Sequence, residues 1–243
     1  MRRRVTTWTA VLSGVTLVLG LPALAVSGVP AGATSSPLAT NNPQSAGIAG
    51  YYLAPPPASA SARDTFMVPT LTCTSTSTGV AFGSFIIVTT VGEGPIAEVL
   101  AECQGGVAVY SGAVEVNATT TITSFTPRAR DTMRASVAES PTGATATLRD
   151  VTQATSKSVS TTTGATNSIV EDGTYWDHSG ATLLPVPNFG KVKISGATID
   201  GVTPNAAGAF AVDRVDDGNR VQIHTGLLNA AGKSWTEVFK LSL

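Results

Sequence analysis

The chain has 243 residues, 13% of them charged, and a formal net charge of −1. This balance argues against a nucleic-acid-binding protein, because such proteins gather Lys and Arg on one surface. Once a leader is set aside, the length suits a single domain.

The first 33 residues have the order of a secretory signal. Arginines at positions 2–4 precede an apolar run, and small residues at 23–25 and 31–33 follow it. Gly14, Gly20 and Pro22 interrupt the run, which favours a cleaved signal over a retained membrane anchor. We therefore predict a signal over residues 1–33, cleaved near 25 or 33, and a secreted, extracellular protein with no membrane association after cleavage.

Residues 34–64 are rich in Ser, Thr, Ala, Pro and Gly. Such a composition buries little apolar surface, so it predicts a disordered arm. Tyr51–Leu53 is an exception, because this short apolar segment could dock on the domain as an added strand. The domain itself is then expected over residues 65–243.

Beyond residue 64, the apolar runs are short, rich in Val, Ile and Thr, and bounded by Gly, Pro, Asn or Asp, as is typical of β-strands. A hairpin turn is expected at Gln104–Gly106, and residues 117–127 are expected to be a strand edge or loop. No window shows helical periodicity over three turns. This pattern predicts an all-β fold, an antiparallel two-sheet β-sandwich or jelly roll. The expected strands are 65–69, 82–91, 96–102, 107–117, 131–139, 144–150, 157–163, 168–171, 190–199, 209–215, 220–225 and 234–241.

The strand over residues 107–117 shows which side chains share a face. Alternation puts Ser111, Ala113 and Glu115 on one face, and Tyr110 and Val114 on the other. One face of this strand is therefore polar or small and carries a carboxylate.

The two cysteines, Cys73 and Cys103, favour a disulfide, because an even pair is usually bridged in an exported protein. Two buried free thiols or a metal pair are the alternatives. The histidines, His178 and His224, are far from both cysteines in sequence and not at ligand spacing, so we expect no metal site.

Several segments, in order, resemble the glutamic peptidases, or eqolisins, over about residues 65–200. They are Phe66–Pro69, Tyr110–Val116, Asp131–Met133, Thr142–Leu148, Ile169–Asp172 and Pro185–Val192. The resemblance implies a concanavalin-like sandwich of two curved sheets, with the substrate cleft on the concave sheet.

In that family a Glu takes a proton from water and a Gln amide holds the oxyanion. The resemblance carries the general-base role onto Glu171. It carries the Gln role onto Val99, which has no amide, so Glu98 and Gln104 are the possible substitutes. The alternative interpretation makes Glu98 an outward strand charge and Gln104 a solvated turn residue.

The same resemblance assigns substrate contacts to Glu115, Tyr110 and Trp176. Two functions then compete. The first is an acid-acting endopeptidase, monomeric and without metal or organic cofactor, that cleaves a polypeptide. The second is a non-catalytic sandwich that binds peptide or glycan after loss of the Gln. A purely structural exported module is a third.

Overall fold

The computed structural model describes residues 42–45, 47–53, 59–74, 79–88, 94–116, 121–165, 168–175, 186–216 and 219–240. The predicted signal of residues 1–33 lies outside these ranges. Within them, no helix is long and apolar enough to cross a membrane.

The described chain is almost entirely β-strand, with one short helix, α1 (Pro204–Ala207). The strands are β1 (Gln44–Ser45), β2 (Ile48–Leu53), β3 (Ala60–Met67), β4 (Gly79–Val88), β5 (Ile96–Gln104), β6 (Val107–Glu115), β7 (Thr121–Phe125), β8 (Thr132–Ser140), β9 (Gly143–Asp150), β10 (Thr155–Thr161), β11 (Ser168–Tyr175), β12 (Lys191–Ile199), β13 (Phe210–Val215), β14 (Val221–Thr225) and β15 (Ser234–Phe239).

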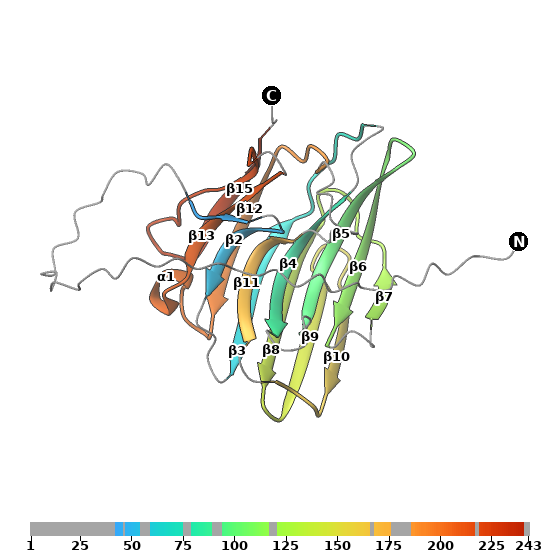
Figure 1. Ribbon diagram of the computed structural model, residues 1–243. Helices are drawn as coiled ribbons and strands as arrows, with labels where there is room; N and C mark the ends of the chain where they lie inside the picture. The colour runs from blue at the N-terminus through green and yellow to red at the C-terminus, as the bar shows by residue number, and fades with distance from the viewer. Residues whose placement is uncertain are drawn as a thin grey trace, which may run out of the picture.

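These strands follow one hydrogen-bonded path, β10-β9-β8-β3-β12-β15-β14-β13-β2-β11-β4-β5-β6-β7, with β1 beside β13. We call the first seven strands of this path sheet A: β10, β9, β8, β3, β12, β15 and β14. We call the last six sheet B: β2, β11, β4, β5, β6 and β7. Strand β13 joins them, because it pairs with β14 on one side and β2 on the other. Strand β3 of sheet A packs against β4 and β11 of sheet B, and β8 packs against β4 (Figure 1). The predicted all-β, antiparallel fold is confirmed, whereas a jelly-roll order of strands stays a prediction.

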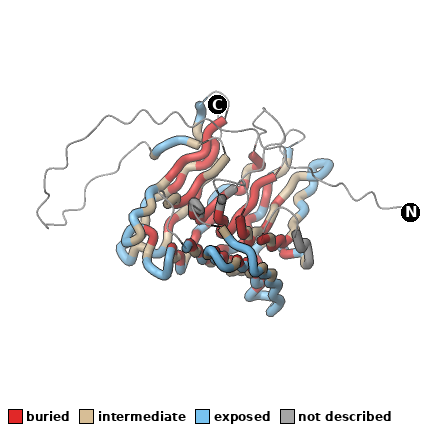
Figure 2. The backbone as a smooth tube through the Cα atoms, turned by 60° about the horizontal axis from the view of Figure 1, so that its bottom comes forward, coloured by how far each residue is buried: buried red, intermediate tan, exposed pale blue. Residues whose placement is uncertain are grey.

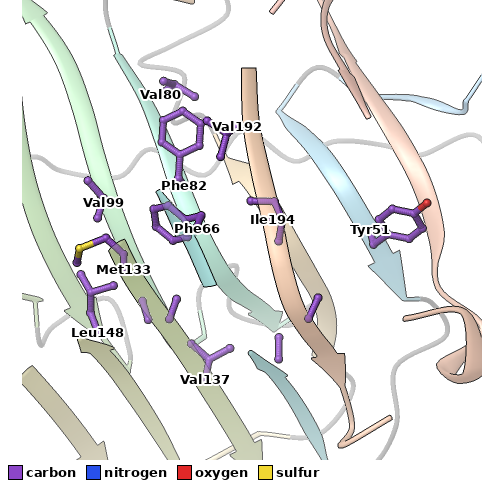
Figure 3. Packing of buried hydrophobic residues seen from close by; sticks show 14 of the residues in the cluster. Tyr51, Phe66, Val80, Phe82, Val99, Met133, Val137, Leu148, Val192 and Ile194 are labelled. Carbon is purple, nitrogen blue, oxygen red and sulfur yellow. The ribbon is translucent and has the colours of Figure 1, made fainter. Parts of the chain in front are cut away.

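The core lies between the two sheets and follows from the alternation of side chains along each strand. In β3, Ala60, Ala62 and Phe66 are buried, and the residues between them are more exposed. Phe66 lies near Phe82 of β4, and both belong to one cluster that also holds residues from β5, β8, β9 and β12 (Figure 3). The buried residues run along the strands, and the exposed ones gather at the turns (Figure 2).

The N-terminal boundary of the domain differs from the expected one. The stretch predicted as an arm, residues 34–64, contains β1, β2 and the start of β3. Strand β2 lies between β11 and β13, so it is an internal strand of the fold. Tyr51 and its neighbours do add a strand, as their apolar character suggested. A second difference is β7, which lies within the Thr/Ser-rich stretch expected to be an edge or loop.

A row of glycines crosses the middle of sheet B. Gly173 of β11 pairs with Gly50 of β2 and with Gly83 of β4. All three have a positive φ, from +140° to +157°. A Cβ atom on Gly83 would overlap the carbonyl oxygen of Ala97, and one on Gly50 would overlap that of Asp172. The neighbouring backbones therefore approach more closely here than a side chain would permit.

Replacing Gly83 with alanine tests this close approach. We expect Gly83→Ala to lower the free energy of unfolding by roughly 2–4 kcal/mol, because the added Cβ must displace the backbone of β5. Urea unfolding measures the loss. Gly47→Ala is the matched control, since a Cβ there meets nothing within 4 Å. Equal stability of the two variants would contradict the role of the row.

Candidate functional site

The outer face of sheet B, the face turned away from the core, carries Glu98. This residue lies on β5 directly opposite Gly83 of β4 and Ala113 of β6. Its chain neighbours Ala97 and Val99 are buried in the core, and Glu98 itself is half-buried. Because neighbours along a strand point to opposite faces, Glu98 lies on the outer face.

The position that the sequence analysis gave to the family's Gln faces the interior. The sequence analysis put that position at Val99, which is fully buried between the sheets. A slip of one residue along a strand exchanges its two faces. The residue of β5 that can meet a substrate on the outer face at this point is therefore Glu98.

Residue 171, the predicted general base, lies in the middle of β11. Its backbone pairs with Tyr52 of β2 on one side and with Phe85 of β4 on the other. Its chain neighbours Val170 and Asp172 are buried. The side chain of Glu171 lies outside the described part of the structure. Strand β4 is thus the one strand between residue 171 and β5.

Gln104, the other possible substitute for the amide, lies far from this position. It ends β5, whereas Ile96 at the opposite end of that strand is the residue paired with Phe85. Its exposed side chain donates a hydrogen bond to Glu102 Oε2 at 3.1 Å. The register does not bring Gln104 to residue 171.

Glu115, predicted to contact substrate, lies on β6 opposite Ile96 and so shares the outer face of sheet B. It is separated from β11 by β4 and β5. At about 4.8 Å between strands, it lies roughly 14 Å from residue 171 across the sheet.

Tyr110, the second predicted contact, takes a different place. It pairs with Ala101, which is buried in the core, so it lies on the interior face of β6. Its hydroxyl donates to the carbonyl oxygen of Pro69 at 3.0 Å and accepts from the backbone N–H of Leu71 at 3.2 Å. These bonds hold the segment after β3 against β6, so the geometry gives Tyr110 a structural role and does not support a substrate contact. Trp176, the third, lies outside the described residues.

The predicted disulfide is confirmed. Cys73 and Cys103 are bonded, with their Cα atoms 5.4 Å apart. The bond ties the segment after β3 to the end of β5, close to the contacts of Tyr110. The disulfide and the hydrogen bonds of Tyr110 thus fix the segment after β3 to the hairpin of β5 and β6. Gln104 follows Cys103 directly, so it lies beside the bridge.

Behind β11, on the interior face, lies a cluster of buried carboxyl groups that the sequence analysis did not predict. Asp172 of β11, Asp64 of β3 and Glu237 of β15 are each at most 1% exposed. The Ser84 hydroxyl lies 3.4 Å from Asp172 Oδ1, and the Trp235 indole N–H donates to Glu237 Oε1 at 3.1 Å. Three strands from the two sheets therefore meet at acidic side chains.

Burial shifts the pKa of all three groups upward. Desolvation raises the pKa of Asp64 to about 7 and that of Glu237 to about 8. Desolvation and the neighbouring Asp64 carboxyl raise the pKa of Asp172 well above its usual value. Asp172 Oδ2 and Glu237 Oε2 have no hydrogen-bond partner among the described residues. These carboxyl groups are consequently protonated, neutral side chains at mildly acidic pH.

Alternation along each strand marks these acids as interior residues, although it does not show that they meet. Asp64 has the same parity as Phe66, Asp172 the same as Val170, and Glu237 the same as Trp235. An acid at an interior position of a strand is rare, because burying a charge is costly.

A small void lies between this cluster and the glycine row. Its volume of about 10 Å³ has room for about one water molecule, and Gly50, Phe85, Asp172 and Thr174 are among its lining residues. A larger, shallow depression of about 610 Å³ lies elsewhere, at the ends of β3, β8 and β9. None of the predicted site residues lines that depression.

The comparisons with known proteins show the family and the fold. The sequence profile of the peptidase A4 family matches residues 46–232, more than half of the chain, so the chain belongs to this family of glutamic peptidases. No curated protein sequence matches it.

Two solved structures share the fold. A scytalido-glutamic peptidase bound to a peptide-based transition-state analogue is 17% identical, with a TM-score of 0.62, and the match covers 79% of this chain and 97% of that one. SCP-B, an eqolisin in complex with the tripeptide Ala-Ile-His, is also 17% identical, with a TM-score of 0.59 and coverage of 79% and 97%.

The buried carboxyl groups predict that the fold weakens as pH rises. Each has a pKa above its unfolded value of about 4, so its contribution is complete below about pH 4 and is lost as the pH rises through the folded-state pKa, which is about 7 for Asp64 and about 8 for Glu237. We expect the free energy of unfolding to fall by several kcal/mol, on an order-of-magnitude scale, between about pH 4 and 8. Urea titrations at a series of pH values measure the fall.

The variant Glu237→Gln removes one of the titrating groups while keeping the shape of the side chain. Its stability should fall less steeply with pH than that of the wild type. Glu102→Gln is the control, because Glu102 is only half-buried and lies on β5, outside the cluster. The stability of this variant should fall with pH as steeply as that of the wild type. A wild-type stability that is constant or rises over this range would rule out the neutral cluster.

Proposed function

We propose that this chain is an exported endopeptidase of the glutamic type that acts at acid pH on polypeptides. Residue 171 supplies the general base, and Glu98 supplies the hydrogen-bond donor that the family draws from a Gln. The proposal rests above all on one observation: Glu98 is directly opposite Gly83, and Gly83 is directly opposite Gly173, two residues along β11 from Glu171.

The register supports a shared face for the two acids. Residues directly opposite in antiparallel strands share a face, so Glu98, Gly83 and position 173 belong to the outer face of sheet B. Position 171, two residues from 173, has the same parity. Two strand spacings and two residues separate Glu98 from position 171, about 12 Å between Cα atoms, with no side chain at Gly83 between them. A peptide backbone placed along this gap would come within reach of both side chains.

The chemistry follows from the two carboxyl groups in different protonation states. The ionised Glu171 accepts a proton from a water molecule, whose oxygen attacks the carbonyl carbon of the peptide bond. The carbonyl oxygen becomes an oxyanion, and the protonated Glu98 donates a hydrogen bond to it. Glu171 then gives its proton to the amide nitrogen, the C–N bond breaks, and a carboxylic acid and an amine leave.

This division of roles requires acid pH. A carboxyl group can donate only while protonated, whereas the base must be ionised, so both conditions hold together only when the pKa values of the two groups differ. The neutral cluster behind β11 favours the same range, since the fold is most stable there. The predicted signal of residues 1–33 makes export to an acidic extracellular medium part of this proposal.

A degradation assay with an unfolded protein substrate between about pH 2 and 7 tests the base. Glu171→Gln should lower the rate at least ~10²-fold, because the amide cannot accept the proton of water. Glu102→Gln, a carboxylate on β5 at some distance from β11, is the matched control and should keep the wild-type rate. Background rates for wild type and both variants would instead support the non-catalytic binding protein considered above.

Two substitutions of Glu98 test the donor. Glu98→Ala removes it and should cost about 10²–10³ in rate. Glu98→Gln installs an amide that donates at every pH, so this variant should remain active, and its rate should persist to higher pH than that of the wild type. The pH–rate profiles of the three proteins decide the matter. A Glu98→Gln enzyme as slow as Glu98→Ala would show that position 98 does not hold the oxyanion.

A further inference from the structure

The outer face of sheet A carries a group of basic side chains that plays no part in the proposed proteolysis. We call it the cationic face: Arg63 of β3, Arg134 of β8, Arg149 of β9, and Lys191 and Lys193 of β12. These residues alternate with core positions such as Met133, Leu148 and Ile194, so they point away from the core. In Figure 1 this sheet lies behind sheet B, so the cationic face is on the far side from Glu98.

No acidic side chain lies on this face among the described residues of β3, β8, β9, β10 and β12. The acids of these strands, Asp64, Glu139 and Asp150, are buried at interior positions. Hydroxyl groups fill the space between the cations. They belong to Thr65, Ser136, Thr145, Thr147, Ser156, Ser158 and Ser195. Although the chain as a whole has a net charge of −1, its sheet A surface is therefore strongly positive.

Three observations indicate that the described residues do not balance these cations. Arg134 and Arg149 are directly opposite each other on β8 and β9, an arrangement of like charges that destabilises a strand pair. The Nε atom of Arg134 is buried without a hydrogen-bond partner among the described residues. The salt bridges among the described residues are Arg220–Asp216 and His224–Asp213, and neither involves a residue of the cationic face.

We propose that the cationic face binds an anionic polysaccharide. Arg134 and Arg149 lie about 4.8 Å apart across β8 and β9, and the other three cations are spread over the same face, which suits a polymer that carries many carboxylates. The hydroxyl groups of the intervening Ser and Thr can pair with sugar hydroxyls. No aromatic side chain of the described strands lies on this face to stack on bases, which disfavours a single-stranded nucleic acid. Binding here leaves the outer face of sheet B free to meet a polypeptide.

The test measures binding of the full exported chain to immobilised polygalacturonate at about pH 5, where the uronates are ionised. Neutral dextran is the reference matrix. We expect retention on polygalacturonate only, lost as salt rises from about 50 to 500 mM, because exposed charges are screened. Arg63 and Arg149 are both exposed, so Arg63→Ser with Arg149→Ser should fold normally and bind at least ~10-fold more weakly.

The matched control removes the same charge elsewhere. Lys157→Ser with Lys233→Ser changes two exposed lysines that are not on the cationic face, and should bind like the wild type. Equal weakening of the two double variants would show that net charge alone is at work and would overturn the proposal. Retention on dextran, absence of salt-sensitive retention on polygalacturonate, or stronger binding to phosphatidylserine vesicles than to polygalacturonate would overturn it too. Because this assay needs no proteolysis, its outcome is independent of the proposed activity.

Discussion

The burial of carboxyl groups between the sheets, behind β11, is the constraint from which the rest of the structure follows. Asp64 lies on β3 and Glu237 on β15, both strands of sheet A, and Asp172 lies on β11 of sheet B. Desolvation raises the pKa of all three groups, and several of their oxygen atoms have no hydrogen-bond partner among the described residues, so the buried groups hold their protons at mildly acidic pH. A protein built in this way is suited to an acidic medium. The proposed chemistry, in which one carboxyl group donates and another accepts, needs the same medium.

The glycine row links this interior to the outer face. Gly50, Gly173 and Gly83 bring β2, β11 and β4 close together directly over Asp172. The same row leaves Gly83 and Gly173 without side chains on the outer face next to Glu98. In the proposed function, close backbone packing on one side and access for a substrate on the other thus have a common cause. The two sheets then divide the surface, with carboxyl groups on the outer face of sheet B and, on that of sheet A, cations that have no salt-bridge partner among the described residues.

Much of this could be predicted from the sequence, since alternation and turn residues mark the strands of an antiparallel fold. Strands β8, β9 and β12 lie within a residue or two of their expected bounds, and the disulfide was expected from the pairing of two cysteines. The arm was harder to interpret, because the short apolar β2 is embedded in a Ser-, Ala- and Pro-rich stretch and is placed by its neighbours β11 and β13. The sequence analysis did not separate the interior position 99 from the outer position 98, because similarity of short segments does not fix the register to one residue. The buried acids escaped notice because strand pairing, which is not visible in a single segment, brings them together.

The central claim is that the interior acids are neutral in the folded protein, and carboxyl ¹³C chemical shifts measured by NMR across a pH titration test it directly. The account predicts that Asp64 and Glu237 still show the shift of a protonated carboxyl group at about pH 6, when exposed carboxyl groups have ionised. Ionisation of both residues below about pH 5, with the protein still folded, would contradict it.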